Sequence, residues 1–237
     1  MRNTLISGYT VVLIFAVLFL NSCSGTVEGT GPVVVKKLNI SEFTMLELEL
    51  PATVTLAISD TIQAVVRAQG NIADLIELKN DGDKLIIKCK KDYKSSLPVE
   101  VILTTRQLER IVVNGSGDVN VVNPVRSDEL RMQINGSGDI AIQAFVDKLR
   151  TEINGSGDVT VSGKAAKHRI RMNGSGNVEA GNLQNEVCDI NINGSGDAVL
   201  HVNTDLEAKV LGSGNIRYTG APKVKSEITG SGDISKK

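Results

Sequence analysis

The chain has 237 residues, with 26 basic and 27 acidic side chains and a formal net charge of −1, so no overall field recruits nucleic acid. It contains 23 glycines, no tryptophan and only 3% aromatic residues. Such a composition suits small turns and aliphatic columns, and it argues against a protein that grips sugars by stacking them on aromatic rings.

Residues 1–22 have the pattern of a secretion signal, with Arg2 followed by an unbroken apolar stretch at 11–20 that is too short to span a bilayer. The stretch ends in Leu20-Asn21-Ser22-Cys23, which resembles a bacterial lipobox. This resemblance implies cleavage before Cys23 and lipidation of that residue; the alternative is an ordinary cleaved signal. Several acyl chains would anchor the protein stably. We therefore expect a cell-envelope protein attached to a membrane through its lipid, an outer-membrane lipoprotein that faces the periplasm or the outside.

About 215 residues follow the signal, enough for one or two domains with a real core. Residues 23–32 hold Cys23 and a glycine-rich segment without periodicity, which predicts a flexible tether. Residues 33–110 are predicted to form an N-terminal β region, with strands in the alternating stretches 46–50, 54–58, 85–89 and 99–103. One short helix is expected where Ile72, Leu75 and Ile76 have helical spacing after Asn71, a candidate cap.

Residues 111–237 are dominated by the motif Asn-Gly-Ser-Gly-Asp or a close variant, which occurs seven times. The copies start at Asn114, Asn135, Asn154, Asn173, Asn193, Leu211 and Thr229. Successive starts are 18 to 21 residues apart. A unit of that length cannot bury an apolar face except against its neighbours.

The residues one, three and five positions before each motif are mostly apolar, and the residues between them are mostly polar. This alternation is typical of a strand with one buried face, and a second apolar run begins directly after the motif. Each repeat is therefore predicted to be two short strands joined by a glycine turn. The expected fold is all-β, a parallel β-helix of seven coils stacked about 4.8 Å apart. The N-terminal β region is expected to cover its open first coil, because an exposed strand edge invites association.

The motif itself is interpreted as scaffold, because it lacks the strand, helix and spacing of a phosphate-binding glycine loop. Asparagine side chains at five corners could hydrogen-bond along the stack as a ladder; these are Asn114, Asn135, Asn154, Asn173 and Asn193. The motif contains one aspartate in most coils. This pattern favours aspartates that accept hydrogen bonds from the turn amides, and the alternative is a column of calcium ligands. No metal, cofactor or catalytic site is predicted.

The histidines and cysteines suggest no chemistry. His168 falls in an inward column and is expected to be packed, and His201 has no recognisable companion. Cys89 and Cys188 could pair in an oxidising compartment. Two buried thiols are nevertheless favoured, because Cys188 lies in a column otherwise held by leucines.

Two outer features suggest partners. Four residues before the motif, the first four coils carry Arg110, Arg131, Arg150 and Arg169, which would form an exposed stripe. Either neighbouring acids such as Glu152 neutralise this stripe, or it binds an anionic polymer such as an envelope polysaccharide. The last copy ends at Asp233, and we expect its edge to be covered by a symmetric partner, giving a homo-oligomer, or by a strand borrowed from the first half.

The lipobox, the β-rich first half and the recurrent Asn-Gly-Ser-Gly-Asp coils together resemble the bacterial family of the putative auto-transporter adhesin, head GIN domain, a domain of unknown function. The resemblance runs from about Val33 to the C-terminus and implies a right-handed β-helix in a lipoprotein or secreted protein. It brings no catalytic residues.

The first functional hypothesis is a non-enzymatic, lipid-anchored envelope protein that acts as an adhesin or binds an extracellular polymer. A polysaccharide lyase or hydrolase is the alternative, by analogy with other β-helices. A periplasmic structural or stress-related component that binds another envelope protein is the third.

Overall fold

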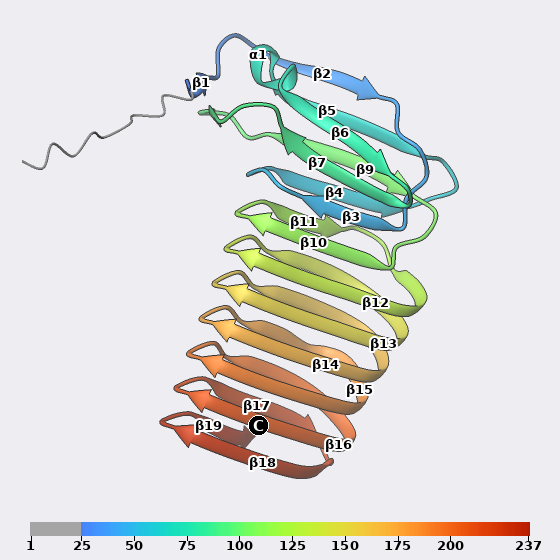
Figure 1. Ribbon diagram of the computed structural model, residues 1–237. Helices are drawn as coiled ribbons and strands as arrows, with labels where there is room; N and C mark the ends of the chain where they lie inside the picture. Colours follow the sequence, from blue (N-terminus) through green and yellow to red (C-terminus); the bar gives the residue numbers. More distant parts are fainter. Residues whose placement is uncertain (1–24) are drawn as a thin grey trace, which may run out of the picture.

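The computed structural model describes residues 25–237 (Figure 1). The predicted signal at 1–22 and the lipidation of Cys23 lie outside the described residues. Within the described part, no helix has the length and apolar character needed to cross a membrane.

The N-terminal part consists of nine strands and one short helix. They are β1 (Val27–Glu28), β2 (Val33–Leu38), β3 (Met45–Leu48), β4 (Thr53–Ile58), β5 (Gln63–Gln69), α1 (Gly70–Ala73), β6 (Ile76–Asp81), β7 (Lys84–Cys89), β8 (Tyr93–Lys94) and β9 (Glu100–Thr105). The four strands predicted in this part are β3, β4, β7 and β9.

The remaining strands form the repeat region, in which the motifs lie. They are β10 (Arg110–Gly115), β11 (Asp118–Val121), β12 (Val125–Gly136), β13 (Ile140–Gly155), β14 (Val159–Gly174), β15 (Val178–Gly194), β16 (Ala198–Gly212), β17 (Asn215–Gly220), β18 (Lys223–Gly230) and β19 (Asp233–Lys236).

The repeat region is a parallel β-solenoid in which equivalent residues of successive coils stack in register (Figure 1). For example, Asn135 pairs with Asn154 and Asn154 with Asn173. In Figure 1 the strands in front run to the glycine corners, and the strands behind run back from them. The chain moves down by one coil in each turn, so the solenoid is right-handed. The predicted fold class is confirmed.

Each complete coil contains one long strand rather than two short ones. β13, β14, β15 and β16 are 16, 16, 17 and 15 residues long, and each begins just after one motif and continues through the first two positions of the next. The glycine corner is thus the only break in these coils, and the opposite side is a gradual bend (Figure 1). The prediction of two strands was wrong on this point, because backbone pairing with the neighbouring coils continues through the bend, even at Gly163 of β14.

The inward columns fill the lumen with aliphatic side chains. Ile134, Ile153 and Met172 stack one residue before the motif and are at most 2% exposed. Val119, Ile140 and Val159 do the same on the returning strand. Because each coil buries its apolar face against the coils above and below, the stack as a whole forms the core.

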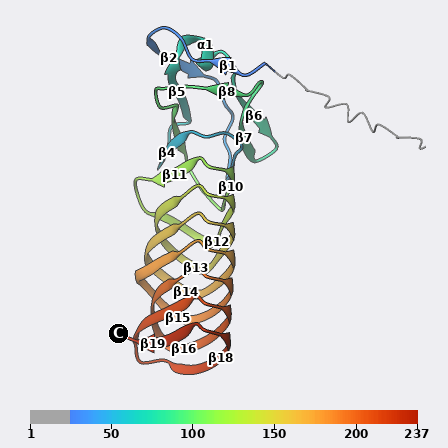
Figure 2. The same cartoon turned by 90° about the vertical axis from the view of Figure 1, so that its left-hand side faces the viewer.

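The two glycines of the motif are required for different reasons. Gly155 has a φ of 143°, a region that side chains rarely adopt, and a Cβ there would lie 2.0 Å from the carbonyl oxygen of Gly136 in the coil above. At Gly157 a Cβ would lie 2.0 Å from the Gly138 carbonyl oxygen and 2.9 Å from Ile134. The corners that face the viewer in Figure 2 can stack closely only without side chains at these positions.

The stack begins before the first motif. β10 pairs in parallel with β3, and β11 with β4, so Ile111 stacks on Leu46 and Val119 on Val54. Above them, β7 pairs with β3 and β9 with β4, again in parallel. The boundary at residue 111 therefore separates repeats from non-repeats in the sequence, whereas in space the solenoid continues into the N-terminal part.

The pairing becomes antiparallel above these strands. β5 pairs with β9 and β2 with β5, while β6 pairs with β7. These strands and α1 lie at the end of the solenoid that carries the N-terminal part (Figures 1 and 2). We call strands β1, β2 and β5 to β8, together with α1, the cap.

The short helix is present but is not capped by Asn71. Gln69 occupies the N-cap position, but its side chain makes no hydrogen bond that caps the helix, and Ile76 already belongs to β6. Asn71 instead binds the backbone before β2: its amide donates to the Glu28 carbonyl oxygen (2.7 Å), and its side-chain oxygen accepts from the Thr30 N–H (2.9 Å). This residue therefore fastens the incoming chain to the cap.

Both described cysteines are free thiols. Cys188 is buried in β15 and Cys89 is half-buried in β7. The first coils of the repeat region lie between these two strands. Burial, with a smaller effect of Asp189, raises the pKa of the Cys188 thiol to about 12, so this side chain behaves as a small hydrophobe.

The last described coil is not covered by the first half of the chain. β18 and β19 lie at the end opposite the cap (Figure 1), and every residue of β18 is exposed. The expectation that this chain's own first half lends a strand here was wrong, because its strands are used at the other end.

Candidate functional site

The asparagine side chains of the first four corners form a hydrogen-bonded ladder. Asn135 donates to Asn114 (2.8 Å), Asn154 to Asn135 (3.1 Å) and Asn173 to Asn154 (2.9 Å). Asn114 donates to Glu47 of β3 (3.0 Å), which ends the ladder at the first strand of the stack. Asn193 occupies the next register position but makes no such bond to Asn173 within the described residues.

The aspartate column forms a second ladder through the backbone. Asp118 accepts from the N–H of Asp139 (3.0 Å), and Asp139 from that of Asp158 (2.8 Å). Asp158 accepts from both the N–H and the side-chain amide of Asn177, at 2.7 and 2.9 Å. These carboxylates therefore serve the turn amides. Within residues 25–237, no group of three His, Cys, Asp or Glu side chains could hold a metal ion.

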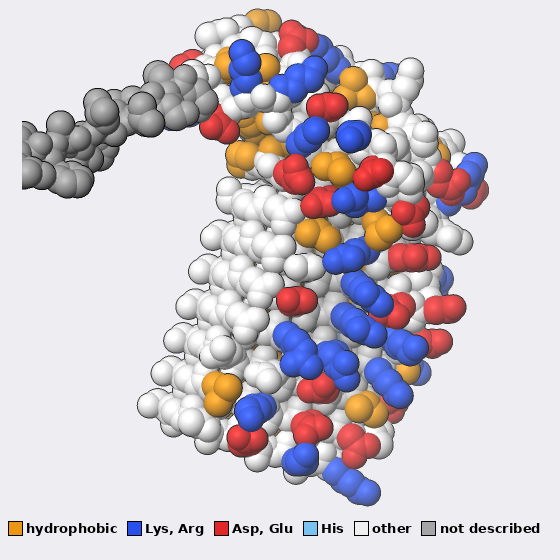
Figure 3. Space-filling model, viewed as in Figure 1, with side chains coloured by type: hydrophobic (Ala, Val, Ile, Leu, Met, Phe, Trp, Pro, Cys, Tyr) orange, Lys and Arg blue, Asp and Glu red, His pale blue; other side chains and the backbone are white. Residues whose placement is uncertain are grey.

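The four arginines stack in register along one face. Arg110 pairs with Arg131, Arg131 with Arg150 and Arg150 with Arg169, and Asp189 takes the next place. Figure 3 shows the resulting charged face, which lies beside corners that show few charged side chains in this view.

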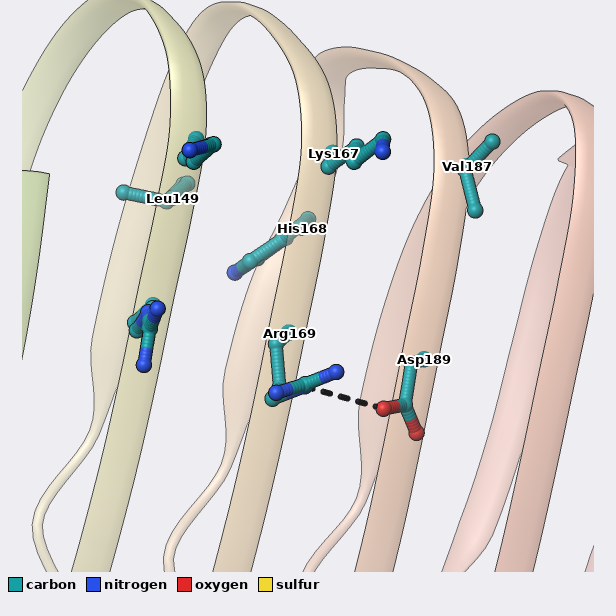
Figure 4. Close-up of a pocket in the computed structure, with 8 residues that line it drawn as sticks. Leu149, Lys167, His168, Arg169, Val187 and Asp189 are labelled. Carbon is teal, nitrogen blue, oxygen red and sulfur yellow. Dashed lines mark hydrogen bonds and ion pairs between the residues drawn. The ribbon is translucent and has the colours of Figure 1, made fainter. Parts of the chain in front are cut away.

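Acidic side chains neutralise much of this column. Glu129 accepts a hydrogen bond from the Nε of Arg131 (2.8 Å) and forms an ion pair with the Nε of Arg150 (2.9 Å), so it bridges two stacked guanidinium groups. The hydrogen bond from Arg131 is the main reason that the pKa of Glu129 lies below its usual value. Arg169 pairs with Asp189 at 3.0 Å (Figure 4). The column is thus in part an ion-pair network, although Glu152, the acid named from the sequence, belongs to none of these pairs among the described residues.

Additional cations flank the column on the two middle coils. Lys148 and Lys167 stack two residues before Arg150 and Arg169, and Arg171 lies two residues after Arg169. Among the ion pairs of the described residues, none involves Lys148, Lys167 or Arg171. We call the exposed side chains of Lys148, Arg150, Lys167, Arg169 and Arg171 the basic patch.

A surface depression of about 250 Å³ lies within the patch, lined by residues that include Lys148, Lys167 and Val187 (Figure 4). His168 stands between Lys167 and Arg169 on β14 but is 2% exposed, with its Nε2 at 2.9 Å from the Thr151 hydroxyl and its Nδ1 unpartnered. Burial lowers its pKa to about 3, so the ring is neutral at ordinary pH. The chemistry that this arrangement offers is therefore attraction of anions by fixed cations.

The sequence pattern pointed to the arginines but missed three of the five residues of the basic patch. Lys148, Lys167 and Arg171 were not singled out, although the same period-2 argument places them on the outer face. The cross-coil role of Glu129 was missed because a carboxylate two residues from an arginine in the sequence gives no sign of a second arginine in the next coil.

The fold and this face can be compared with known proteins. The family model of the putative auto-transporter adhesin, head GIN domain, matches residues 42–222. The chain belongs to this family. The head GIN match spans most of the solenoid together with β3 to β9, so it includes both the basic patch and part of the cap. No curated protein matches the chain significantly.

Solved structures share the head GIN fold over their whole length. A putative adhesin from Bacteroides fragilis is 25% identical with a TM-score of 0.84, covering 89% of this chain and 99% of that one. A putative lipid binding protein from Parabacteroides distasonis is 22% identical (TM-score 0.76), with the same coverage. A putative adhesin from Parabacteroides merdae is 21% identical (TM-score 0.74), covering 89% and 98%. The family description and the adhesin-like neighbours indicate an envelope or surface protein.

Proposed function

We propose that this head GIN protein is a non-enzymatic adhesin, lipid-anchored through Cys23, whose basic patch binds an acidic extracellular polymer. The family description and the neighbour named an adhesin support attachment as the general role. The lipobox at Leu20 to Cys23 supports the anchor.

The observation that favours an acidic polymer as the ligand is the set of cations in the basic patch that make no ion pair. Five cationic side chains lie on β13 and β14, and three of them, Lys148, Lys167 and Arg171, make no ion pair within the described residues. Coils stack about 4.8 Å apart, so the cations form a compact array rather than isolated charges. An extended polyanion can neutralise several such groups at once, which a single small anion cannot.

The patch is tested by replacing Lys148, Lys167 and Arg171 with alanine together. Exposed ion pairs are each worth up to about 1 kcal/mol, so loss of three should weaken binding to a polyuronate in low salt by up to about a hundredfold. The control removes three positive charges from exposed sites outside the patch, Lys37, Lys90 and Lys91, and should bind as the unchanged protein does.

Three results of this experiment would contradict the proposal: equal binding by both variants, equal binding to a neutral dextran, or shortening of the polymer. The last result would instead support the polysaccharide lyase or hydrolase. Selective capture of an envelope protein with no affinity for polyuronate would support the structural component.

The anchor is tested separately with Cys23→Ser in bacterial cells. Loss of the lipid should move the protein from the membrane fraction to the soluble fraction and abolish incorporation of a labelled fatty acid. Unchanged fractionation of the variant would leave an ordinary cleaved signal as the better explanation. Protease treatment of intact cells distinguishes a surface protein from a periplasmic one.

A further inference from the structure

The last described coil exposes side chains whose counterparts in the preceding coil are buried. Val224 and Ile228 of β18 are 40% and 43% exposed, whereas Leu206 and Val210, which pair with them one coil earlier, are 1% and 0% exposed. The lumen of the solenoid therefore opens at this end onto two aliphatic side chains.

The backbone of β18 is also available for pairing. The backbone N–H of Arg131 donates to the carbonyl oxygen of Glu109 in the preceding coil at 2.9 Å. Lys225 of β18 occupies the same position of the repeat, so its N–H also points toward the preceding coil. Successive residues of a strand alternate in this direction. Val224, Ser226 and Ile228 therefore direct their N–H and C=O groups away from β16, and an edge of this kind is a template for another strand.

The sequence of β18 is complementary to itself in one antiparallel register. With Ser226 opposite Ser226 of a second copy, Val224 lies opposite Ile228 and Lys225 lies opposite Glu227 of that copy. A slip of the two strands against each other by two residues places Lys225 opposite Lys225 or Glu227 opposite Glu227, which is unfavourable. Only the Ser226-centred register joins apolar to apolar and cation to anion.

The preceding coil extends this match. Lys225 already pairs with Glu207 at 2.6 Å, and Glu227 with Lys209 at 3.0 Å. In the Ser226-centred register, the column then reads Glu207, Lys225, Glu227 and Lys209 across the two copies, with alternating sign throughout. The arginine column at the other end of the solenoid contains four like charges in succession, so this alternation is particular to the end near β18.

We propose that two copies of this protein associate end to end through antiparallel β18 strands, with Ser226 on the two-fold axis. The two lumens then join into one, which buries Val224 and Ile228. Because this axis is perpendicular to the strand face, the basic patches of both copies lie on the same side of the dimer.

The charge pairing is tested by sedimentation of residues 25–237. The unchanged chain should show a reversible monomer–dimer equilibrium. Lys225→Glu alone and Glu227→Lys alone each place like charges opposite each other twice per dimer, and each should raise the dissociation constant at least about tenfold. An equimolar mixture of the two variants restores opposite charges at both pairs and should form a heterodimer.

The register is tested with Ser226→Cys in a Cys89→Ser background, which removes the half-buried thiol. Directly opposite, hydrogen-bonded residues have Cα atoms about 5.5 Å apart, within the range of about 4.4–6.8 Å for a disulfide, so oxidation should link the two copies covalently. Ser235→Cys in the same background is the control on β19.

Several outcomes would overturn the proposal. They are an unchanged chain that sediments as a monomer at all concentrations, a dimer indifferent to both charge reversals, or linkage no better for Ser226→Cys than for the control. Because these measurements contain no polymer, they are independent of the proposed binding function.

Discussion

Gly155→Ala is expected to destabilise the folded chain by roughly 3–5 kcal/mol. Backbone strain at a φ of 143° contributes about 1–3 kcal/mol. The added Cβ would also lie 2.0 Å from the carbonyl oxygen of Gly136, and only movement of one coil against the next can relieve this contact. Urea denaturation followed by circular dichroism measures the loss.

Gly115→Ala separates the two effects. Gly115 has a φ of 111°, but a Cβ there meets nothing within 4 Å, because no motif lies in the coil above it. This control should lose only about 1–3 kcal/mol. If both variants are equally stable, the close stacking of the corners is not what requires glycine, and the interpretation of the motif as a packing device fails.

The buried histidine should make stability depend on pH in a defined window. The pKa of His168 is about 3 in the folded chain and about 6.5 in the unfolded one, so the unfolded state binds the extra proton between these values. Stability is therefore full above pH 6.5 and is lost as the pH falls toward 3. Between pH 7.5 and 5.0 the contribution of this residue should amount to about 2 kcal/mol.

His168→Leu isolates this contribution, because leucine occupies the same column at Leu149 and Leu206 and does not titrate. The unfolding free energy of the variant should fall less between pH 7.5 and 5.0, by the same amount of about 2 kcal/mol. The lowered pKa of Glu129 affects stability only below about pH 4.3, outside this interval. Parallel pH profiles for both chains would show that His168 is not held neutral by burial.

The solenoid could be predicted because both the motif and the alternation of apolar residues recur at regular intervals in the sequence. The spacing of the motifs gave the coil, and the alternation before each motif placed Ile134 and Ile153 in the lumen, where they are fully buried. The same alternation gave the stacking of Arg131 on Arg150. The direction of each side chain follows from the two-residue period of a strand, and the stacking follows from the recurrence of the motif.

The cap and the ion pairs could not be predicted in the same way. The sequence of the N-terminal part contains no repeated motif. It therefore does not indicate that β3 and β4 continue the stack or that β2 and β5 pair antiparallel above it. The bridge from Glu129 to Arg150 depends on side-chain rotamers in two coils, which no alternation specifies. The continuity of each strand through the bend was missed, because the polar stretch there and Gly163 in one copy resemble a turn in the sequence.

The position of β1 has a consequence for attachment. Val27 lies at the cap, and Cys23 precedes it by four residues, a span of at most about 14 Å. A lipid on Cys23 would therefore keep the cap close to its membrane, while β18 lies at the opposite pole of the rod. Two such rods joined at β18 would carry their lipids at the two extremes, a geometry suited to bridging separate membranes.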